Sequence, residues 1–212
     1  MRCCLDTLFA VTEPVAAMPP SGVLVAAVLA GCLLAPAALA AEAKEGQETA
    51  ILAGGCFWGM EEIIREIPGV ISTEVGYIGG STDAPTYRQV CSGTTGHAEA
   101  VEIVFDPAVL PYDRLLDFFF RMHDPTTPNR QHNDIGTQYR SAIFTTSPAQ
   151  QQAAKQKIAE LDKAQRFRRP IVTQVVEAGP FYAAEDYHQD YLVKNPGGYN
   201  CHVLRSWDQI DH

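Results

Sequence analysis

Positive charge is scarce in this sequence, which carries 16 Lys and Arg residues against 25 Asp and Glu and has a formal net charge of −9. No basic stripe is visible along the chain. Proteins that bind nucleic acid need such a surface to meet the phosphates, so the composition argues against that function. No internal repeat is visible either, and a chain of 212 residues is long enough to bury one sizeable core.

Metal-ligand patterns are also missing. The histidines lie singly, without the short paired spacing of a zinc site, and the motif C-x-x-C does not occur. The sequence therefore predicts no metal centre, and it gives no sign of a bound cofactor.

A long apolar run is present only near the start of the chain. Val23–Ala40 contains no charged residue and ends in Ala38-Leu39-Ala40, the pattern of a secretory cleavage site. The run is marginal in length for a membrane span. We therefore expect export to the periplasm and three parts of the chain: a signal peptide at 1–40, a linker at 41–48 and a folded domain at 49–212.

Two alternatives for this segment stay open. The run at 23–40 is an uncleaved membrane anchor in the first, and Cys32 carries a lipid in the second. Leu29-Ala30-Gly31-Cys32 resembles a lipoprotein cleavage box, but the apolar run continues past the cysteine, where a lipoprotein normally turns polar.

The number of cysteines is odd once the expected signal peptide is removed. Three of the six cysteines lie in residues 1–40, which leaves Cys56, Cys91 and Cys201. An exported protein with a framework of structural disulfides needs an even number, so at least one thiol is free or changes partner. Cys91 is expected to be a small structural residue beside a turn.

The apolar patterns predict alternating strands and helices. Strands are expected at 49–53, 70–77, 99–105, 139–145 and 171–177, and helices at 57–67, 111–122, 147–165 and 183–194. The strand at 99–105 alternates apolar and polar residues, which predicts that it is half-buried. The order β-α-β-β-α-β-α-β-α predicts an α+β two-layer sandwich, a mixed sheet with helices around a ferredoxin-like core, followed by a long irregular C-terminal tail.

The first strand leads into the segment Gly54-Gly55-Cys56-Phe57-Trp58-Gly59. Cys56 therefore lies on the turn before a helix, where free backbone N–H groups and the helix dipole favour a thiolate. Two aromatic side chains, Phe57 and Trp58, follow directly. A lone cysteine at a strand end is more often a buried structural residue, but small neighbours on one side favour a reactive thiol here.

Four further polar residues lie at strand ends or in loops, where a sheet can present them beside Cys56. Each has an ordinary interpretation: Glu99 as a solvated carboxylate, Tyr87 and Tyr139 as core aromatics with a satisfied hydroxyl, and Asp134 as a turn residue.

Together these segments resemble the A-type methionine sulfoxide reductases, over about residues 49–201. The resemblance is carried by several blocks in order: Gly55-Cys56-Phe57-Trp58-Gly59, Tyr87, Gly96-His97-Ala98-Glu99, His132-Asn133-Asp134-Ile135-Gly136-Thr137-Gln138-Tyr139-Arg140-Ser141 and Glu185-Asp186-Tyr187-His188-Gln189-Asp190-Tyr191. It implies reduction of methionine S-sulfoxide, free or in oxidised proteins, to methionine.

The resemblance also implies a role for each residue. Cys56 attacks the sulfoxide sulfur as a thiolate, and Glu99, kept neutral by burial, protonates the departing oxygen. The remaining residues are expected to hold the substrate: the hydroxyls of Tyr87 and Tyr139 its oxygen, an apolar pocket of Phe57 and Trp58 its methyl group, and Asp134 the polar side of the site.

The product on Cys56 is a sulfenic acid, which the resemblance implies is closed into a disulfide by Cys201. Cys201 lies in the glycine-rich tail, which we expect to swing to the site. A thioredoxin-type dithiol then resets the enzyme. A monomer is the default expectation.

Two other functions stay open at this stage. One is a secreted thiol hydrolase, in which His97 or His188 acts as the base for Cys56. The other is a non-enzymatic binding domain, in which Cys56 and Cys201 form a permanent structural disulfide.

Overall fold

The computed structural model describes residues 46–210. The expected signal peptide at 1–40 lies outside these residues, as does the greater part of the expected linker at 41–48. Across the described part of the chain, no helix has the length and apolar character needed to cross a membrane.

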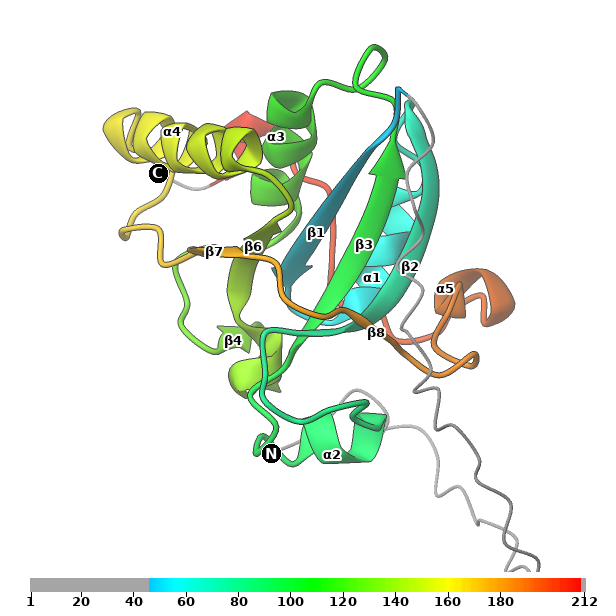
Figure 1. Cartoon of the computed structure of the whole chain (residues 1–212). Coiled ribbons are helices and arrows are strands. Elements are labelled where there is room, and N and C mark those ends of the chain that lie inside the picture. Colours follow the sequence, from blue (N-terminus) through cyan, green and yellow to red (C-terminus); the bar gives the residue numbers. More distant parts are fainter. Residues whose placement is uncertain (1–45, 211–212) are drawn as a thin grey trace, which may run out of the picture.

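A six-stranded mixed sheet forms the centre of the fold (Figure 1). Its strand order is β7-β6-β1-β3-β2-β8, and all neighbours are antiparallel except β6 and β7. The bounds are β1 Glu48–Gly54, β2 Val70–Ile78, β3 Ala98–Phe105, β6 Ser141–Thr145, β7 Gln174–Glu177 and β8 Tyr182–Ala183. A separate hairpin pairs β4 Arg130–Gln131 with β5 Asp134–Ile135.

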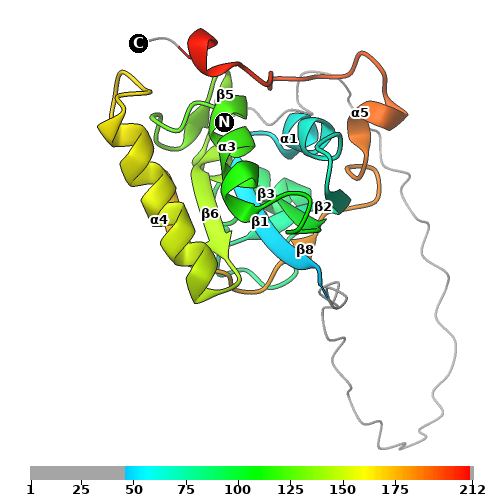
Figure 2. The same ribbon diagram turned by 90° about the horizontal axis from the view of Figure 1, so that it is seen from above.

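Helices pack on one face of this sheet, as the view from above shows (Figure 2). Their bounds are α1 Phe57–Ile64, α2 Tyr87–Cys91, α3 Tyr112–Met122, α4 Pro148–Lys163 and α5 Tyr191–Lys194, with short 3-10 turns η2 Thr137–Tyr139 and η3 Trp207–Gln209. The predicted α+β class, with its mixed sheet and helices, is confirmed.

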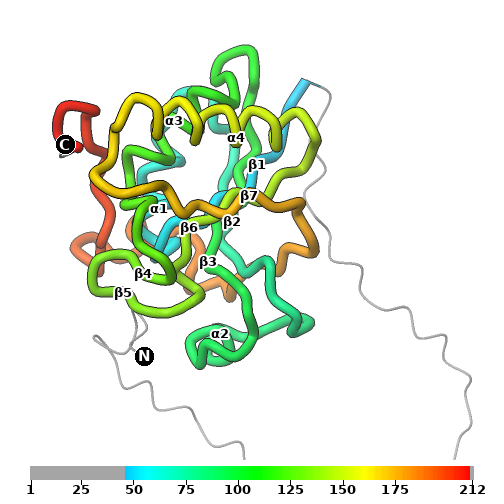
Figure 3. The backbone as a smooth tube through the Cα atoms, turned by 90° about the vertical axis from the view of Figure 1, so that its left-hand side faces the viewer, coloured from blue at the N-terminus to red at the C-terminus, as the bar shows by residue number. Residues whose placement is uncertain are grey.

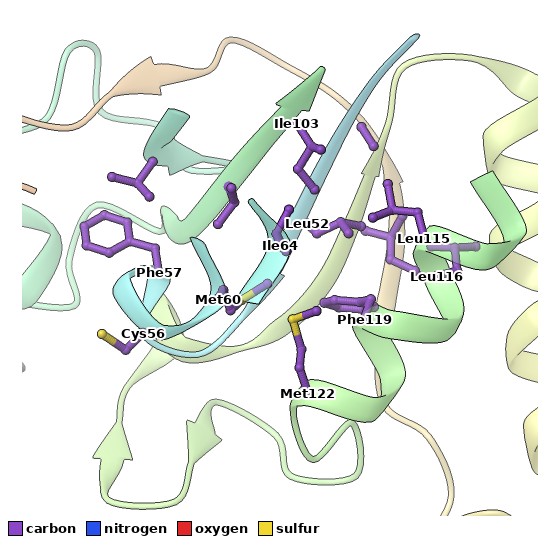
Figure 4. Packing of buried hydrophobic residues seen from close by; sticks show 14 of the residues in the cluster. Leu52, Cys56, Phe57, Met60, Ile64, Ile103, Leu115, Leu116, Phe119 and Met122 are labelled. Atoms are coloured by element: carbon purple, nitrogen blue, oxygen red, sulfur yellow. The ribbon is translucent and has the colours of Figure 1, made fainter. Parts of the chain in front are cut away.

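The main core lies between the sheet and the helices. Figure 4 shows Leu52 of β1 and Ile103 of β3 among side chains of α1 and α3. A second, smaller cluster packs on the opposite face of the sheet, around Ile51 and Phe144. The prediction of a half-buried strand at 99–105 was therefore wrong, because β3 is central and every residue in it is buried.

The helix predicted at 183–194 was also wrong over most of its length. Only its last turn, α5, is helical, and Ala183 instead pairs with Gly76 at the edge of the sheet. The side chain of Gln189 then bonds both backbone groups of Val75, accepting from its N–H at 2.8 Å and donating to its carbonyl at 2.9 Å. Hydrogen bonds to β2 therefore replace those that a helix would make within itself.

Two local features escaped the sequence patterns. The stretch after β2 was expected to be turns, but it contains α2, which begins with a capping box between Thr86 and Gln89. The strand expected from residue 139 begins at Ser141, since Tyr139 belongs to η2.

Candidate active site

Cys56 is the N-cap residue of α1, on the turn that follows β1. Gly55 before it adopts φ +115°, and a Cβ there would lie 2.7 Å from Cγ of Gln131, so this position requires glycine. Cys56 is 1% exposed, and its sulfur is directed away from Met60 and Phe119 (Figure 4). The sulfur therefore lies at the positive end of a helix, while Cys56 itself is a buried member of the main core.

Glu99 lies at the start of β3 and is fully buried. The backbone N–H of Phe57 donates to its Oε2 at 3.2 Å, while Oε1 has no hydrogen-bond partner among the described residues. Burial raises the pKa of Glu99 well above its ordinary value, and the charges of Asp134 and Cys201 add to this against the opposing Phe57 hydrogen bond. Burial therefore favours the neutral acid form of this side chain, which is hydrogen-bonded to the first residue of the helix that Cys56 caps.

Cys201 contacts Cys56 directly. Both are free thiols, and Cys201 accepts a hydrogen bond from the Cys56 thiol. This bond lowers the pKa of Cys201, and contacts with His202 and Asp134 lower it further, against burial, which raises it. The tail was expected to swing to the site, and the structure already places it there.

The C-terminal tail is held at several points as it passes the start of α1 toward α3 (Figure 2). Tyr199 donates its hydroxyl to Oδ1 of Asp134 at 3.2 Å. Further along, the Arg205 guanidinium donates to the backbone carbonyls of Arg121 and His123. Since Cys201 covers Cys56 in this arrangement, substrate can reach Cys56 only after this part of the tail has moved.

Asp134, Tyr87 and Tyr139 lie on three different elements. Asp134 in β5 is buried and contacts Cys201, and Tyr139 follows it in η2, fully buried. Tyr87 begins α2, and its ring lies 4.4 Å from that of His188. The tyrosines are therefore buried residues, as their ordinary interpretation required, and they also lie on the segments that form the site.

Phe57 and Trp58 form an aromatic wall with His188. The Trp58 indole N–H donates to Nδ1 of His188 at 3.0 Å, and the Trp58 ring stacks on Tyr191 at 3.7 Å. Burial lowers the pKa of His188 to about 4, so this ring is neutral near pH 7. Both predicted pocket residues are buried, and Trp58 is held on one side by His188 and on the other by Tyr191.

Three residues of the site were not singled out from the sequence. Tyr77 lies opposite Glu99 in the pairing of β2 with β3, and its hydroxyl donates to Oε2 of Glu185 at 2.9 Å. Oε1 of the same Glu185 carboxylate accepts a hydrogen bond from the backbone N–H of Tyr87 at 2.9 Å. His202 is the third, and its position directly after Cys201 was the available signal.

The two histidines named for the hydrolase alternative are bound to other groups. The ring of His97 is engaged on both sides, by the backbone N–H of Gly80 at 3.1 Å and the carbonyl of Thr82 at 2.8 Å. Nδ1 of His188 is taken by Trp58. The imidazole that contacts the pair of thiols belongs instead to His202, through Cys201. Among residues 46–210, no group of three His, Cys, Asp or Glu side chains is arranged to hold a metal ion.

Comparison with known proteins identifies close relatives. Residues 48–210 match the family model described as peptide methionine sulfoxide reductase. The peptide methionine sulfoxide reductase MsrA of Methanoculleus marisnigri is 53% identical over 155 residues, which cover 73% of this chain and 94% of the relative.

Solved structures agree with this result. Reduced Mxr1 from Saccharomyces cerevisiae superposes with a TM-score of 0.73 at 39% identity, covering 78% of this chain and 96% of Mxr1. Mxr1 in complex with Trx2 superposes with a TM-score of 0.54 at 24% identity, covering 80% of this chain and 97% of that one.

Proposed function

The chain belongs to the peptide methionine sulfoxide reductase family and is a methionine sulfoxide reductase, and from this premise we propose how its residues carry out the reaction. The substrate is the S epimer of methionine sulfoxide, either free or in an oxidised protein. The observation that carries the proposal is the pairing of a helix-capping thiol with a buried, neutral carboxylic acid through the first residue of α1.

In the first half of the reaction, the Cys56 thiolate attacks the sulfoxide sulfur. A bond forms between the two sulfurs as the oxygen gains a proton. The resulting hydroxyl then passes to the Cys56 sulfur while the sulfur–sulfur bond breaks, and the electron pair of that bond returns to the methionine sulfur. Glu99 supplies this proton from Oε1, since Oε2 accepts the Phe57 N–H. The hydroxyls of Tyr87 and Tyr139 hold the oxygen as it becomes negative. The products are methionine and a sulfenic acid on Cys56.

Substrate recognition follows from the polarity of the two sides of the site. The Phe57–Trp58 wall receives the methyl group, once the tail has moved, and Trp58 is kept in place by His188 and Tyr191. Asp134 lies on the polar side, where Tyr199 also contacts it.

In the second half, Cys201 closes a disulfide on Cys56 and water is released. A dithiol of the thioredoxin type then reduces this disulfide and restores both thiols. The complex of yeast Mxr1 with Trx2 supports a reductant of this class for the present chain.

Single turnover without reductant tests this proposal. The reduced protein is mixed with excess S-sulfoxide, and methionine and disulfides are counted by mass spectrometry. We expect one methionine per protein molecule and a disulfide between Cys56 and Cys201. Cys56→Ser should give no methionine, whereas Cys201→Ser should give methionine and a stable sulfenic acid. Full methionine yield from Cys56→Ser would refute the assignment of the nucleophile.

We further propose that the protein is exported after cleavage near Ala40, so that it repairs proteins in the periplasm. The apolar run and its A-x-A ending support this. Mass spectrometry of the protein purified from the expressing cell gives the mature N-terminus. A chain that begins at Ala41 supports cleavage, a lipid-modified Cys32 supports the lipoprotein alternative, and an intact segment supports an anchor.

A further inference from the structure

His202 lies directly behind the Cys201 thiol. Its Nδ1 is 3.1 Å from Sγ of Cys201, and its Nε2 is 3.0 Å from the backbone carbonyl oxygen of Gly54. The ring is buried, and the backbone N–H of His202 donates to Oδ1 of Asn200 at 2.9 Å. The imidazole is therefore fixed between β1 and the thiol and has little freedom to rotate.

These contacts determine which ring nitrogen carries the hydrogen. The Gly54 carbonyl only accepts, so Nε2 is the donor in that bond. In the neutral ring Nδ1 is then a free acceptor, aimed at the Cys201 thiol. Transfer of the thiol proton to Nδ1 produces a thiolate and an imidazolium that remain hydrogen-bonded to each other.

The charged groups around the ring favour this transfer. Burial lowers the pKa of His202, but the hydrogen bond and charge of Cys201, the Gly54 carbonyl and the charge of Asp134 raise it overall. His123, after α3, is the other titratable group that faces the ring. Burial lowers the pKa of His123 to about 3, so it is neutral near pH 7 and does not compete for the proton.

The fold leaves space for this pair only because α1 carries glycine where the tail crosses it. A Cβ at Gly59 would lie 2.6 Å from Oδ1 of Asn200 and 2.8 Å from Nδ1 of His202. The tail and α1 are thus in close contact at His202, which indicates that the fold holds the imidazole in one defined position.

We propose that His202 is the acid–base catalyst of the disulfide-forming step. The proposal rests on the function proposed above and adds a residue to its second half. His202 takes the proton of Cys201, and the thiolate attacks the sulfur of the Cys56 sulfenic acid. The sulfur–sulfur bond forms as the sulfur–oxygen bond breaks, and the departing hydroxide receives the proton from the imidazolium and leaves as water. Cys56 is reduced and Cys201 oxidised, so no further oxidant is needed.

Rapid-quench single turnover of the full protein tests the proposal, with methionine and disulfide counted in the same samples. His202→Gln keeps an amide that can donate to the Gly54 carbonyl but cannot carry the proton. We expect it to close the disulfide about tenfold more slowly near pH 7, because the Cys201 thiol then titrates near its ordinary pKa. Its closure rate should rise with pH up to about 8.5, whereas the wild-type rate should change little over that range.

The matched control is His132→Asn, which removes an exposed histidine outside the pair of thiols and should match the wild type. Closure by His202→Gln at the wild-type rate, with the wild-type pH dependence, would overturn the proposal. A wild-type protein that forms no methionine would instead overturn the function on which it rests.

A second measurement needs neither turnover nor closure. It compares the ultraviolet absorbance of Cys56→Ser with that of the double variant in which Cys201→Ser is added. The difference between the two reports the Cys201 thiolate. We expect this thiolate to form below the ordinary cysteine pKa of about 8.5, and to move toward that value in His202→Gln and in His202→Asn. An unchanged titration in both variants would contradict the ion pair.

Discussion

At the scale of single residues, the site depends on keeping a carboxylic acid neutral beside a sulfur anion. Glu99 is held by one backbone N–H, and the negative charges nearest to it oppose its ionisation. A solvated glutamate would be ionised near pH 7 and would have no proton to give. The burial of Glu99 at the start of a central strand is therefore a requirement of the chemistry.

Replacing Glu99 by Gln removes the proton but keeps the size of the side chain. We expect methionine formation in a single turnover to slow by about 10²- to 10⁴-fold. In the wild type the rate should fall as the pH rises through the raised pKa of Glu99, since the donor is then ionised, and this alkaline fall should vanish in the variant. Glu102→Gln is the control, because that buried glutamate lies on the same strand but points to the other face. If Glu99→Gln keeps the wild-type rate and the same fall in rate at high pH, Glu99 is excluded as the acid.

The tyrosine hydroxyls are tested in the same assay. Tyr139→Phe should lower the rate of methionine formation by about 10²-fold, because one donor to the developing oxygen charge is lost. Tyr112→Phe is the control, since Tyr112 is a tyrosine on α3 whose buried hydroxyl has no hydrogen-bond partner within residues 46–210. Equal rates for the two variants would mean that Tyr139 only supports the fold.

At the scale of elements, the position of the C-terminal tail determines when the sulfur of Cys201 can reach the sulfur of Cys56. The smooth tube shows the segment from α5 to the C-terminal end of the described chain lying along one side of the molecule (Figure 3). It contains one short 3-10 turn and is held through side chains, such as Trp207, which donates its indole N–H to Asp117 at 3.1 Å. A segment held by a few side chains can leave and return without unfolding the sheet.

Loosening the tail should therefore slow the second step without slowing the first. Arg205→Ala removes the guanidinium that bonds the carbonyls of Arg121 and His123. We expect disulfide closure to slow by about tenfold, because the local concentration of Cys201 at Cys56 falls. Methionine should form at least as fast as in the wild type, because a looser tail uncovers Cys56 more often. Rapid quench with thiol alkylation measures both steps. Arg114→Ala, at an exposed position on α3, is the control, and closure that is equally fast in both variants would show that Arg205 does not hold the tail.

At the scale of the whole molecule, the sheet acts as a rigid frame that gathers distant parts of the chain. The turn after β1, the start of β3, the β4–β5 hairpin and the tail all meet at one end of it. Cys56 belongs to the main core and Cys201 packs against it, so the folded core fixes Cys56 while the tail carries Cys201.

The proposed reset by a dithiol sets a limit on the redox potential of the Cys56–Cys201 pair. For a thioredoxin-type dithiol to reset the enzyme, the potential must be less negative than about −270 mV, whereas structural disulfides of secreted proteins lie below about −300 mV. Equilibration with glutathione buffers, followed by alkylation and mass spectrometry, measures it. A value below about −300 mV would favour the permanent disulfide instead.

Much of the fold could be predicted because apolar periodicity reflects burial directly. The strands around the core and the helices α1, α3 and α4 fall close to their predicted positions. The helix predicted at 183–194 failed because Ala183 and Gln189 find partners on β2, which no local pattern records. In the same way, alternation along β3 predicted one exposed face and could not reveal the second cluster behind it.

The sequence by itself determined the turn that places Cys56 at the head of a helix, since glycines, an apolar strand and an amphipathic run are local features. It also contained the blocks that resemble the family. Only the tertiary structure decided that Glu99 is buried against Phe57, that Cys201 lies on Cys56 and that His202 stands behind Cys201. The physical reason is that protonation depends on burial and on neighbouring charges, and both are set by chain segments far apart in the sequence.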